Sequence, residues 1–198
     1  MEQKAILLTC PGCGARLSTD MKKCEWCHNP VNISSFDNMC NMSDNDVKKY
    51  ARYYQRKLER NDEDIETTIA LILCYIKLKL YDKAIEKLDN QIDLYFDNAD
   101  LYFYSAVCML KGKKAYLCKR NDIDKIIEYL DNACSLNTLG IYYYFMAYIK
   151  YDFYERNSFN TTPDYKKCIE LAEQYGVTDD EKKQLFEMLS VSRPSELY

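Results

Sequence analysis

Ala84-Ile85-Glu86-Lys87-Leu88-Asp89-Asn90 recurs 42 residues later as Ile126-Ile127-Glu128-Tyr129-Leu130-Asp131-Asn132, and after another 42 residues, more weakly, as Cys168-Ile169-Glu170-Leu171-Ala172. A second element recurs too, because Leu101-Tyr102-Phe103-Tyr104 is echoed forty residues on by Ile141-Tyr142-Tyr143-Tyr144. Helix-pair repeats of this length belong to the solenoid class, since one pair cannot bury its own apolar stripe and must stack on the next. The spacing therefore predicts an all-α repeat domain.

Apolar residues recur at helical spacing from residue 44 to about residue 190. The pattern predicts helices over 44–60, 63–80, 82–95, 99–111, 122–136, 140–154, 163–175 and 179–190. The start of the last helix is marked by the capping box Thr178-Asp179-Asp180-Glu181. We expect this helix to cap the last repeat with an apolar face made of Leu185, Phe186 and Leu189. Its polar face, expected in water, carries Lys182, Lys183 and Glu187.

The repeat resembles a divergent tetratricopeptide repeat over residues 65–175. In the unit that starts near Ile65, the signature positions of that family are occupied by Leu71, Tyr75, Ala84 and Leu88. The next two units are about eight residues longer than the usual length of about 34, so segments 111–121 and 154–163 are expected to be extended helices or longer loops. The resemblance implies a solenoid that binds another protein.

Two C-x2-C pairs precede the helices, Cys10 with Cys13 and Cys24 with Cys27. This spacing lets four thiolates close on one tetrahedral metal ion. The segment resembles the short bacterial zinc-ribbon family, in which CPxCGxxL is followed by a polar hairpin and CxxCGxxV. The resemblance implies a small β zinc ribbon with one structural Zn²⁺, although the ligand type alone does not exclude iron.

His28 stands where that family usually has a second glycine, and it makes the second motif C-x-x-C-H. This is also the attachment pattern of c-type haem. Haem is rejected because it would leave the first cysteine pair unexplained. We expect His28 to be a bystander beside a complete four-cysteine shell.

These patterns predict a zinc ribbon over 1–32, a polar linker over 33–43, a helical repeat domain over 44–190 and a tail over 191–198. The 198 residues are 47% hydrophobic and 29% charged, a soluble balance, and the longest apolar stretch, Ile69–Ile76, is too short to span a membrane. Six further cysteines in no paired pattern favour a reducing compartment, so a cytoplasmic location is expected. Only one histidine and no phosphate-cradling Gly-rich loop are present, which argues against an enzyme.

The repeat register places aromatic residues on the inward face of the first helices. This face could be a groove for an apolar or aromatic segment of another protein, or it could be inter-repeat core; both remain open here. A clamp for a chaperone carboxylate tail is disfavoured because the matching positions are not basic. The candidate partner-binding residues are Phe103, Tyr104, Tyr142 and Phe145.

Lys48, Arg52, Arg56 and Arg60 form a basic stripe at i, i+4 spacing. Such a stripe, with the ribbon, could contact nucleic acid, but the chain has a net charge of −4, and solvated helix faces are the commoner role. The leading hypothesis is a non-enzymatic zinc-binding adaptor, and the main alternative is a nucleic-acid-associated regulator. An enzyme with a redox-active centre is the third hypothesis, which metal analysis would test.

Overall fold

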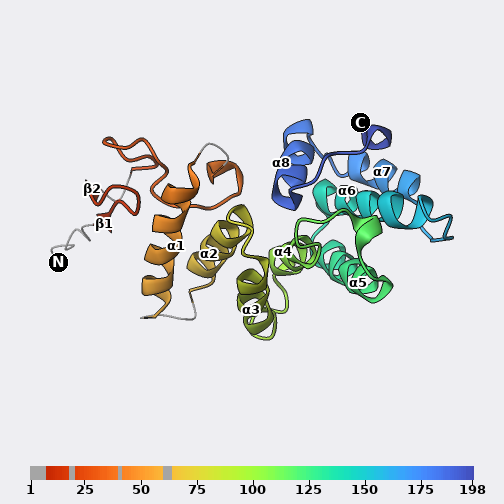
Figure 1. The fold of residues 1–198 in the computed structure, drawn as a ribbon, viewed down its shortest axis with the longest axis horizontal. Helices are drawn as coiled ribbons and strands as arrows, with labels where there is room; N and C mark the ends of the chain where they lie inside the picture. Colours follow the sequence, from red (N-terminus) through yellow and green to blue (C-terminus); the bar gives the residue numbers. More distant parts are fainter. Residues whose placement is uncertain (1–7, 18–20, 40–41, 60–63) are drawn as a thin grey trace. The chain divides into compact units, whose positions relative to one another are not determined.

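The computed structural model describes residues 8–17, 21–39, 42–59 and 64–198. The chain divides into two compact units, Met1–Leu80 and Tyr81–Tyr198. The described residues are mostly helical, with eight α-helices and one small two-stranded sheet (Figure 1). All eight helices predicted from the apolar periodicity are present, with ends within a few residues of the predicted ones.

The first unit begins with a short hairpin and ends with two helices. Strand β1 (Leu8–Thr9) pairs antiparallel with β2 (Arg16–Leu17), and an isolated bridge joins Lys23 to Pro30. The 3-10 helix η1 (Asp37–Met39) follows, and then α1 (Asp44–Leu58) and α2 (Ile65–Lys77), which pack against each other (Figure 1). Both α-helices have a side-chain cap at their start. The Ser43 hydroxyl oxygen accepts the main-chain N–H of Asp46 in α1, and the Asp64 carboxylate accepts that of Thr67 in α2.

The segment expected to be a linker, 33–43, contributes to the core of the first unit. Ile33, Phe36 and Met39 are all buried. The main-chain N–H of Ile33 donates to the Tyr54 hydroxyl of α1 at 3.0 Å, and Lys77 of α2 lies over the Phe36 ring. The compact unit therefore runs from the cysteine turns through α2, and its boundary falls after Leu80.

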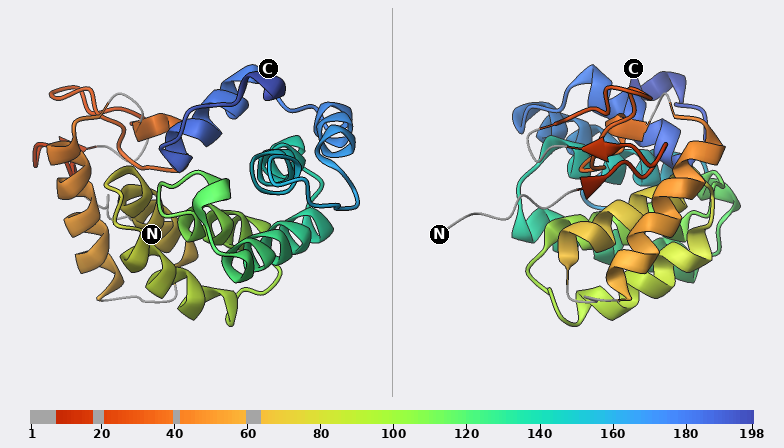
Figure 2. Two further views of the ribbon diagram at one scale, coloured as in Figure 1. Left: turned by 45° about the vertical axis from the view of Figure 1, so that its right-hand side comes forward. Right: turned by 90° about the vertical axis from the view of Figure 1, so that its left-hand side faces the viewer.

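The second unit begins with five helices, and each of the first four packs against the next (Figures 1 and 2). They are α3 (Tyr81–Ile92), α4 (Ala99–Met109), α5 (Arg120–Leu136), α6 (Gly140–Ile149) and α7 (Tyr165–Gln174). Between α4 and α5 lies the 3-10 helix η2 (Ala115–Leu117), and α6 continues directly into a π-helical segment, η3 (Lys150–Glu155). The unit ends with α8 (Asp179–Leu189) and the 3-10 turn η4 (Ser195–Leu197).

The recurring sequence lies within α3, α5 and α7. The first and fifth residues of the motif are buried in each copy, with at most 1% of any of them exposed. These pairs are Ala84 with Leu88, Ile126 with Leu130, and Cys168 with Ala172. The first and fifth residues of the motif therefore lie on a buried face of each of these three alternate helices.

Gly140, the first residue of α6, allows a close approach between α6 and the end of α7. A Cβ atom at this position would lie 2.5 Å from the carbonyl oxygen of Ala172 and 2.6 Å from the main-chain nitrogen of Val177. Both contacts are with main-chain atoms, which cannot move aside cheaply. The absence of a side chain therefore lets the start of α6 lie directly against the end of α7.

Helix α8 packs back onto α6 and α4. The Phe186 ring meets the rings of Tyr144 and Tyr148 edge to face, with centroid distances of 6.3 and 5.2 Å. As predicted, the apolar face of α8 is buried. Lys182, however, does not face water: only 15% of its side chain is exposed, and its ammonium lies over the Tyr144 ring, because a long apolar stem can cover an aromatic face.

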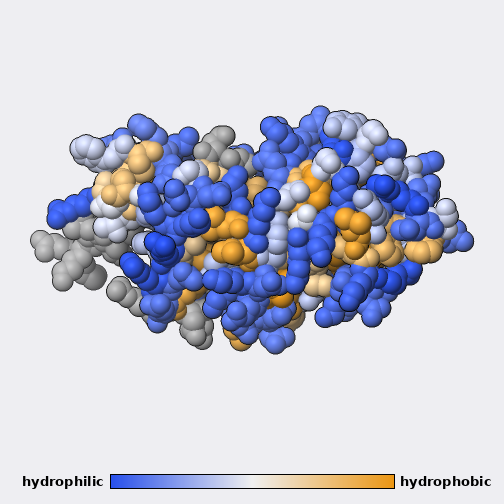
Figure 3. Space-filling model, viewed as in Figure 1, coloured by the Kyte–Doolittle hydropathy of each residue, from blue (hydrophilic) through white to orange (hydrophobic). Residues whose placement is uncertain are grey.

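None of the helices in the described part of the chain combines the length and the apolar composition of a membrane span. The face shown in Figure 3 is mostly hydrophilic, and hydrophobic residues appear on it in separate small patches.

Candidate metal centre

Four cysteine side chains converge at the start of the first unit, and they are the four predicted from the sequence. The sulfurs of Cys10, Cys13, Cys24 and Cys27 all lie within 4.8 Å of one another. Two of the sulfur pairs, Cys10 with Cys27 and Cys13 with Cys24, are 3.6 Å apart. Four sulfurs at Zn–S distances of about 2.3 Å in a tetrahedron would be about 3.8 Å apart. The four thiols are therefore close enough together to bind one tetrahedral ion.

The two turns that carry these cysteines have the same hydrogen-bonding pattern. In the first turn, Gly14 N–H donates to the Cys10 carbonyl and Cys10 N–H donates to the Ala15 carbonyl, both at 2.8 Å. In the second, His28 N–H donates to the Cys24 carbonyl at 2.8 Å, and Cys24 N–H donates to the Asn29 carbonyl at 2.9 Å. The centre is thus built from two copies of one turn, each of which supplies two sulfurs.

This equivalence explains the position of His28. Gly14 and His28 both follow the first cysteine of their turn by four residues, and both have positive φ, 77° and 58°. A left-handed residue is required there, and glycine adopts that conformation at least cost. The His28 side chain is exposed and lies outside the four-cysteine group. His28 is therefore a non-glycine residue at a turn position, as the sequence comparison with the zinc-ribbon pattern predicted.

The thiols differ in their electrostatic environment. Main-chain N–H of Cys27, and less strongly that of Trp26, points to the Cys24 sulfur and lowers the pKa of Cys24 to about 7. Burial raises the pKa of Cys27 to about 12. Four thiolates cannot coexist so close together without a cation, whereas a bound divalent ion deprotonates a coordinating thiol. The donor set is thus suited to Zn²⁺ or iron, whose binding releases protons.

Helix α1 supports the second cysteine turn directly. Tyr50, which is fully buried, donates a hydrogen bond from its hydroxyl to the carbonyl of Pro30. A Cβ atom on Gly12 would lie 3.5 Å from the Cys27 sulfur and 3.6 Å from the Tyr50 ring. The Tyr54 hydroxyl, one turn further along α1, donates to Asn32 at 3.1 Å. The second turn of the four-cysteine cluster is therefore packed on α1.

Three of the four aromatic residues proposed as a partner groove are buried in the second unit. Phe103 packs on Tyr142 and Phe145 with ring centroids 5.1 and 5.9 Å apart, and the Tyr142 hydroxyl donates to Asp100 at 2.9 Å. Phe103, Tyr142 and Phe145 thus belong to the core, and only Tyr104 is partly exposed. Of the two interpretations left open by the sequence, burial favours the core.

The basic stripe is present on the surface of α1. Lys48, Arg52 and Arg56 are exposed and form no ion pair with a described residue, whereas Arg60 lies outside the described residues. The neighbouring lysines are engaged, since Lys49 pairs with Asp46 and Lys57 pairs with Asp64, both at 2.9 Å.

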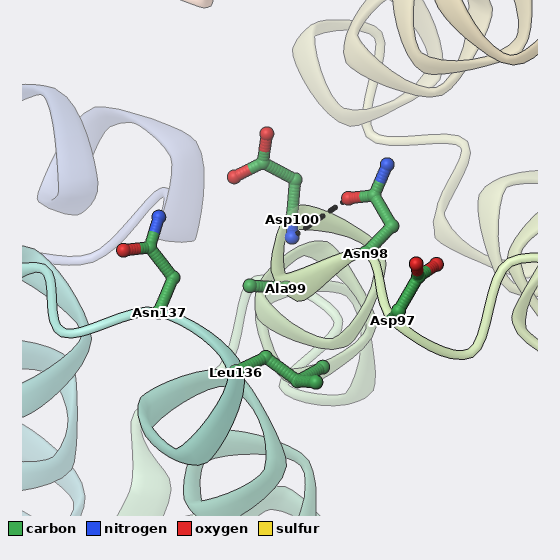
Figure 4. Close-up of a pocket in the computed structure, with 6 residues that line it drawn as sticks. All are labelled: Asp97, Asn98, Ala99, Asp100, Leu136 and Asn137. Carbon is green, nitrogen blue, oxygen red and sulfur yellow. Dashed lines mark hydrogen bonds between the residues drawn. The ribbon is translucent and has the colours of Figure 1, made fainter.

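A hollow of about 410 Å³ lies between the start of α4 and the end of α5 (Figure 4). Asp97 and Asp100 line it, with Asn98 accepting the Asp100 N–H at 3.1 Å. Among the described residues, the cysteine cluster is the only group of three or more His, Cys, Asp or Glu side chains whose ligand atoms are close enough to share a metal ion. The two carboxylates of this hollow therefore do not amount to a metal site.

Sequence reasoning missed the contribution of Tyr50 and Tyr54 to the centre. With Val47 and Leu58 they lie at i, i+3 and i, i+4 spacing, which indicates an apolar face on the helix. Nothing in that spacing indicated that the face would meet the cysteine turns.

Comparison of the chain with protein families, with curated proteins and with solved structures found no match.

Proposed function

We propose that the protein is a non-enzymatic adaptor in which one structural Zn²⁺, bound by Cys10, Cys13, Cys24 and Cys27, stabilises a zinc ribbon packed on helical repeats of the tetratricopeptide type. One observation carries the non-catalytic part. Four cysteines fill a tetrahedral shell, whereas catalytic zinc sites keep one position open for water or substrate. The sole histidine, His28, is exposed and does not belong to the four-cysteine group.

Metal analysis tests the first part of this proposal. Protein purified without chelator should contain one zinc per chain, and Cys24→Ser should lose it. Cys134→Ser is the matched control, because Cys134 is a half-buried cysteine of α5 far along the chain from the cluster, and this variant should keep its zinc. Iron in place of zinc, no metal, or full zinc retention in Cys24→Ser would contradict the proposal.

The adaptor role is supported by the repeat packing and by exposed apolar side chains on the loop between α3 and α4. Leu94 and Phe96 are 62% and 71% exposed, and the Tyr102 hydroxyl donates to the Phe96 carbonyl at 3.0 Å, which holds the loop. Exposed, fixed aromatic and aliphatic side chains are typical of interaction surfaces. The partner in this proposal is a protein that offers an apolar or aromatic segment.

Quantitative affinity purification tests the adaptor role. Leu94→Ser combined with Phe96→Ser should lose a protein that the wild type enriches, with an unchanged melting temperature. Leu117→Ser is the control, since Leu117 is 61% exposed but lies on η2. An identical set of captured proteins for all three would rule out this loop as the binding surface.

The nine described cysteines are all free, which supports a reducing, cytoplasmic compartment.

Nucleic-acid binding is the second candidate function, and the exposed stripe of Lys48, Arg52 and Arg56 favours it. Phosphate contacts of this kind make affinity fall steeply with salt, whereas apolar contacts do not. Replacement of the three residues by glutamine should therefore abolish a salt-sensitive interaction. Binding of the partner that is unaffected by salt between low and physiological concentration would leave only the adaptor role.

A further inference from the structure

A cavity of about 680 Å³ lies within the first unit, between the second cysteine turn and α1. Its size falls within the range of small-molecule sites, roughly 300–1,000 Å³. Three lysines line it, and no described lining residue is acidic, although the chain as a whole has a net charge of −4. Lys22 and Lys23 come from the turn, and Lys57 comes from α1. The described lining of the cavity therefore carries positive charge.

The neutral polar groups of the cavity also offer donors. Asn38 accepts the main-chain N–H groups of Ser34 and Ser35 through its Oδ1, at 3.1 and 3.2 Å, which leaves its NH₂ group for another acceptor. Asn32 likewise accepts the Tyr54 hydroxyl through its Oδ1. Neither amide donates to another described residue, and an amide NH₂ group is a donor that suits an anionic ligand.

The lysines are not equally available. Lys57 pairs with Asp64 at 2.9 Å and donates to Thr67 at 2.6 Å, so its charge is partly neutralised. Lys22 and Lys23 are exposed and form no ion pair with a described residue. These two ammonium groups are thus the ones that can neutralise a phosphate.

One wall of the cavity is aromatic. Tyr53 is half-buried and meets the buried Tyr54 edge to face, with centroids 5.5 Å apart. This packing holds the Tyr53 ring at the cavity, where a planar group can stack on it. Phosphate alone would fill only a small part of the space, whereas a phosphate joined to a planar base would use both the cationic and the aromatic wall.

We propose that this cavity binds a nucleotide, with its phosphate on Lys22 and Lys23 and its base against Tyr53. The nucleotide is either free or part of a single strand, because both present the same chemistry. The adaptor role is not needed for this site. The second cysteine turn is needed, so the metal content of each sample must be measured to separate a failed site from an unfolded turn.

The test uses the zinc-loaded full chain and defined probes. Calorimetry with AMP, adenosine and inorganic phosphate, and fluorescence anisotropy with a fluorescein-labelled ten-nucleotide oligouridylate, measure the affinities. AMP or the oligonucleotide should bind at least about tenfold more tightly than adenosine or phosphate alone. Tight binding by AMP identifies a free nucleotide as the ligand, and binding by the oligonucleotide alone identifies a strand.

Lys22→Gln with Lys23→Gln should weaken the binding probe about tenfold or more, and should reduce the slope of log K against log salt by about 2 for the strand. Tyr53→Leu, which keeps an apolar side chain without a ring, should weaken it roughly tenfold. The matched control is Lys83→Gln with Lys125→Gln, which removes two exposed lysines of the second unit and should leave affinity unchanged. Binding of neither probe, equal binding of phosphate alone, or an equal loss in the control variant, all at full zinc content, would overturn the proposal.

Discussion

Removal of the Tyr50 hydroxyl should weaken metal binding although Tyr50 is not a ligand. The hydroxyl donates to the carbonyl of Pro30, which belongs to the second cysteine turn, while Tyr50 itself belongs to α1. This bond exists only when the turn is folded. In the proposed function a bound metal ion folds the turn, and the free energy of the bond is then part of the free energy of metal binding. Tyr50→Phe deletes the bond and keeps the ring.

The size of the effect follows from burial. Deleting one partner of a buried hydrogen bond costs about 1–3 kcal/mol, and Pro30 is half-buried, so water can partly replace the lost donor. We therefore expect about 1 kcal/mol for Tyr50→Phe, which is about a fivefold loss of zinc affinity. Tyr50→Ala removes a fully buried ring and should cost about 3–5 kcal/mol, a loss of more than about a hundredfold.

Competition for zinc with a chromogenic chelator measures these affinities. Tyr144→Phe is the matched control, because Tyr144 is equally buried and its hydroxyl also donates to a main-chain carbonyl, that of Leu197, at 2.7 Å. It should lower the stability of the second unit and leave zinc affinity unchanged. If Tyr50→Ala retained wild-type zinc affinity, the coupling between α1 and the metal centre would be refuted.

Three other changes test further features. His28→Gly should stabilise the first unit by about 0.5–1 kcal/mol, because a left-handed non-glycine residue costs about 1–2 kcal/mol and the greater chain entropy of unfolded glycine cancels part of that gain. Urea unfolding measures this change in stability. A loss of zinc in the variant would instead indicate a role for the imidazole. Truncation after Val177 removes α8 and uncovers the buried Tyr144 face, so the second unit should melt far lower or aggregate, and a soluble product with an unchanged melt would contradict the packing. Tyr104→Ala with Tyr142→Ala should cost about 3–5 kcal/mol from the fully buried Tyr142 ring, as calorimetry would record, whereas an unchanged melt with lost partner capture would restore the groove.

The metal ligands and the helices were predictable because each is encoded over a short span. Cys10 and Cys13 share one turn, and the geometry of that turn is local. The capping box predicted at Thr178 is present in the structure with both of its hydrogen bonds. The buried first and fifth positions of the recurring motif also follow from local periodicity.

The partner of each buried face was not predictable from the same patterns. Helical spacing showed that Tyr50 lies on an apolar face, but the face could have met another helix as easily as the cysteine turns. Polarity misled in two places. Segment 33–43 looks like a linker because it is rich in Asn and Ser, yet it buries Ile33 and Phe36, and Lys182 looks solvated although its stem covers an aromatic ring.

The order in which the chain is synthesised gives the position of α8 a further meaning. Helices α4 and α6 emerge from the ribosome before α8, so the rings of Tyr144 and Tyr148 that Phe186 later covers are transiently open to other nascent chains. The 3-10 turn η4 emerges later still, and its Leu197 both buries its side chain and accepts a hydrogen bond from the Tyr144 hydroxyl. A translation product that ends before α8 would therefore expose an aromatic surface that is prone to aggregation and that α8 buries in the folded protein.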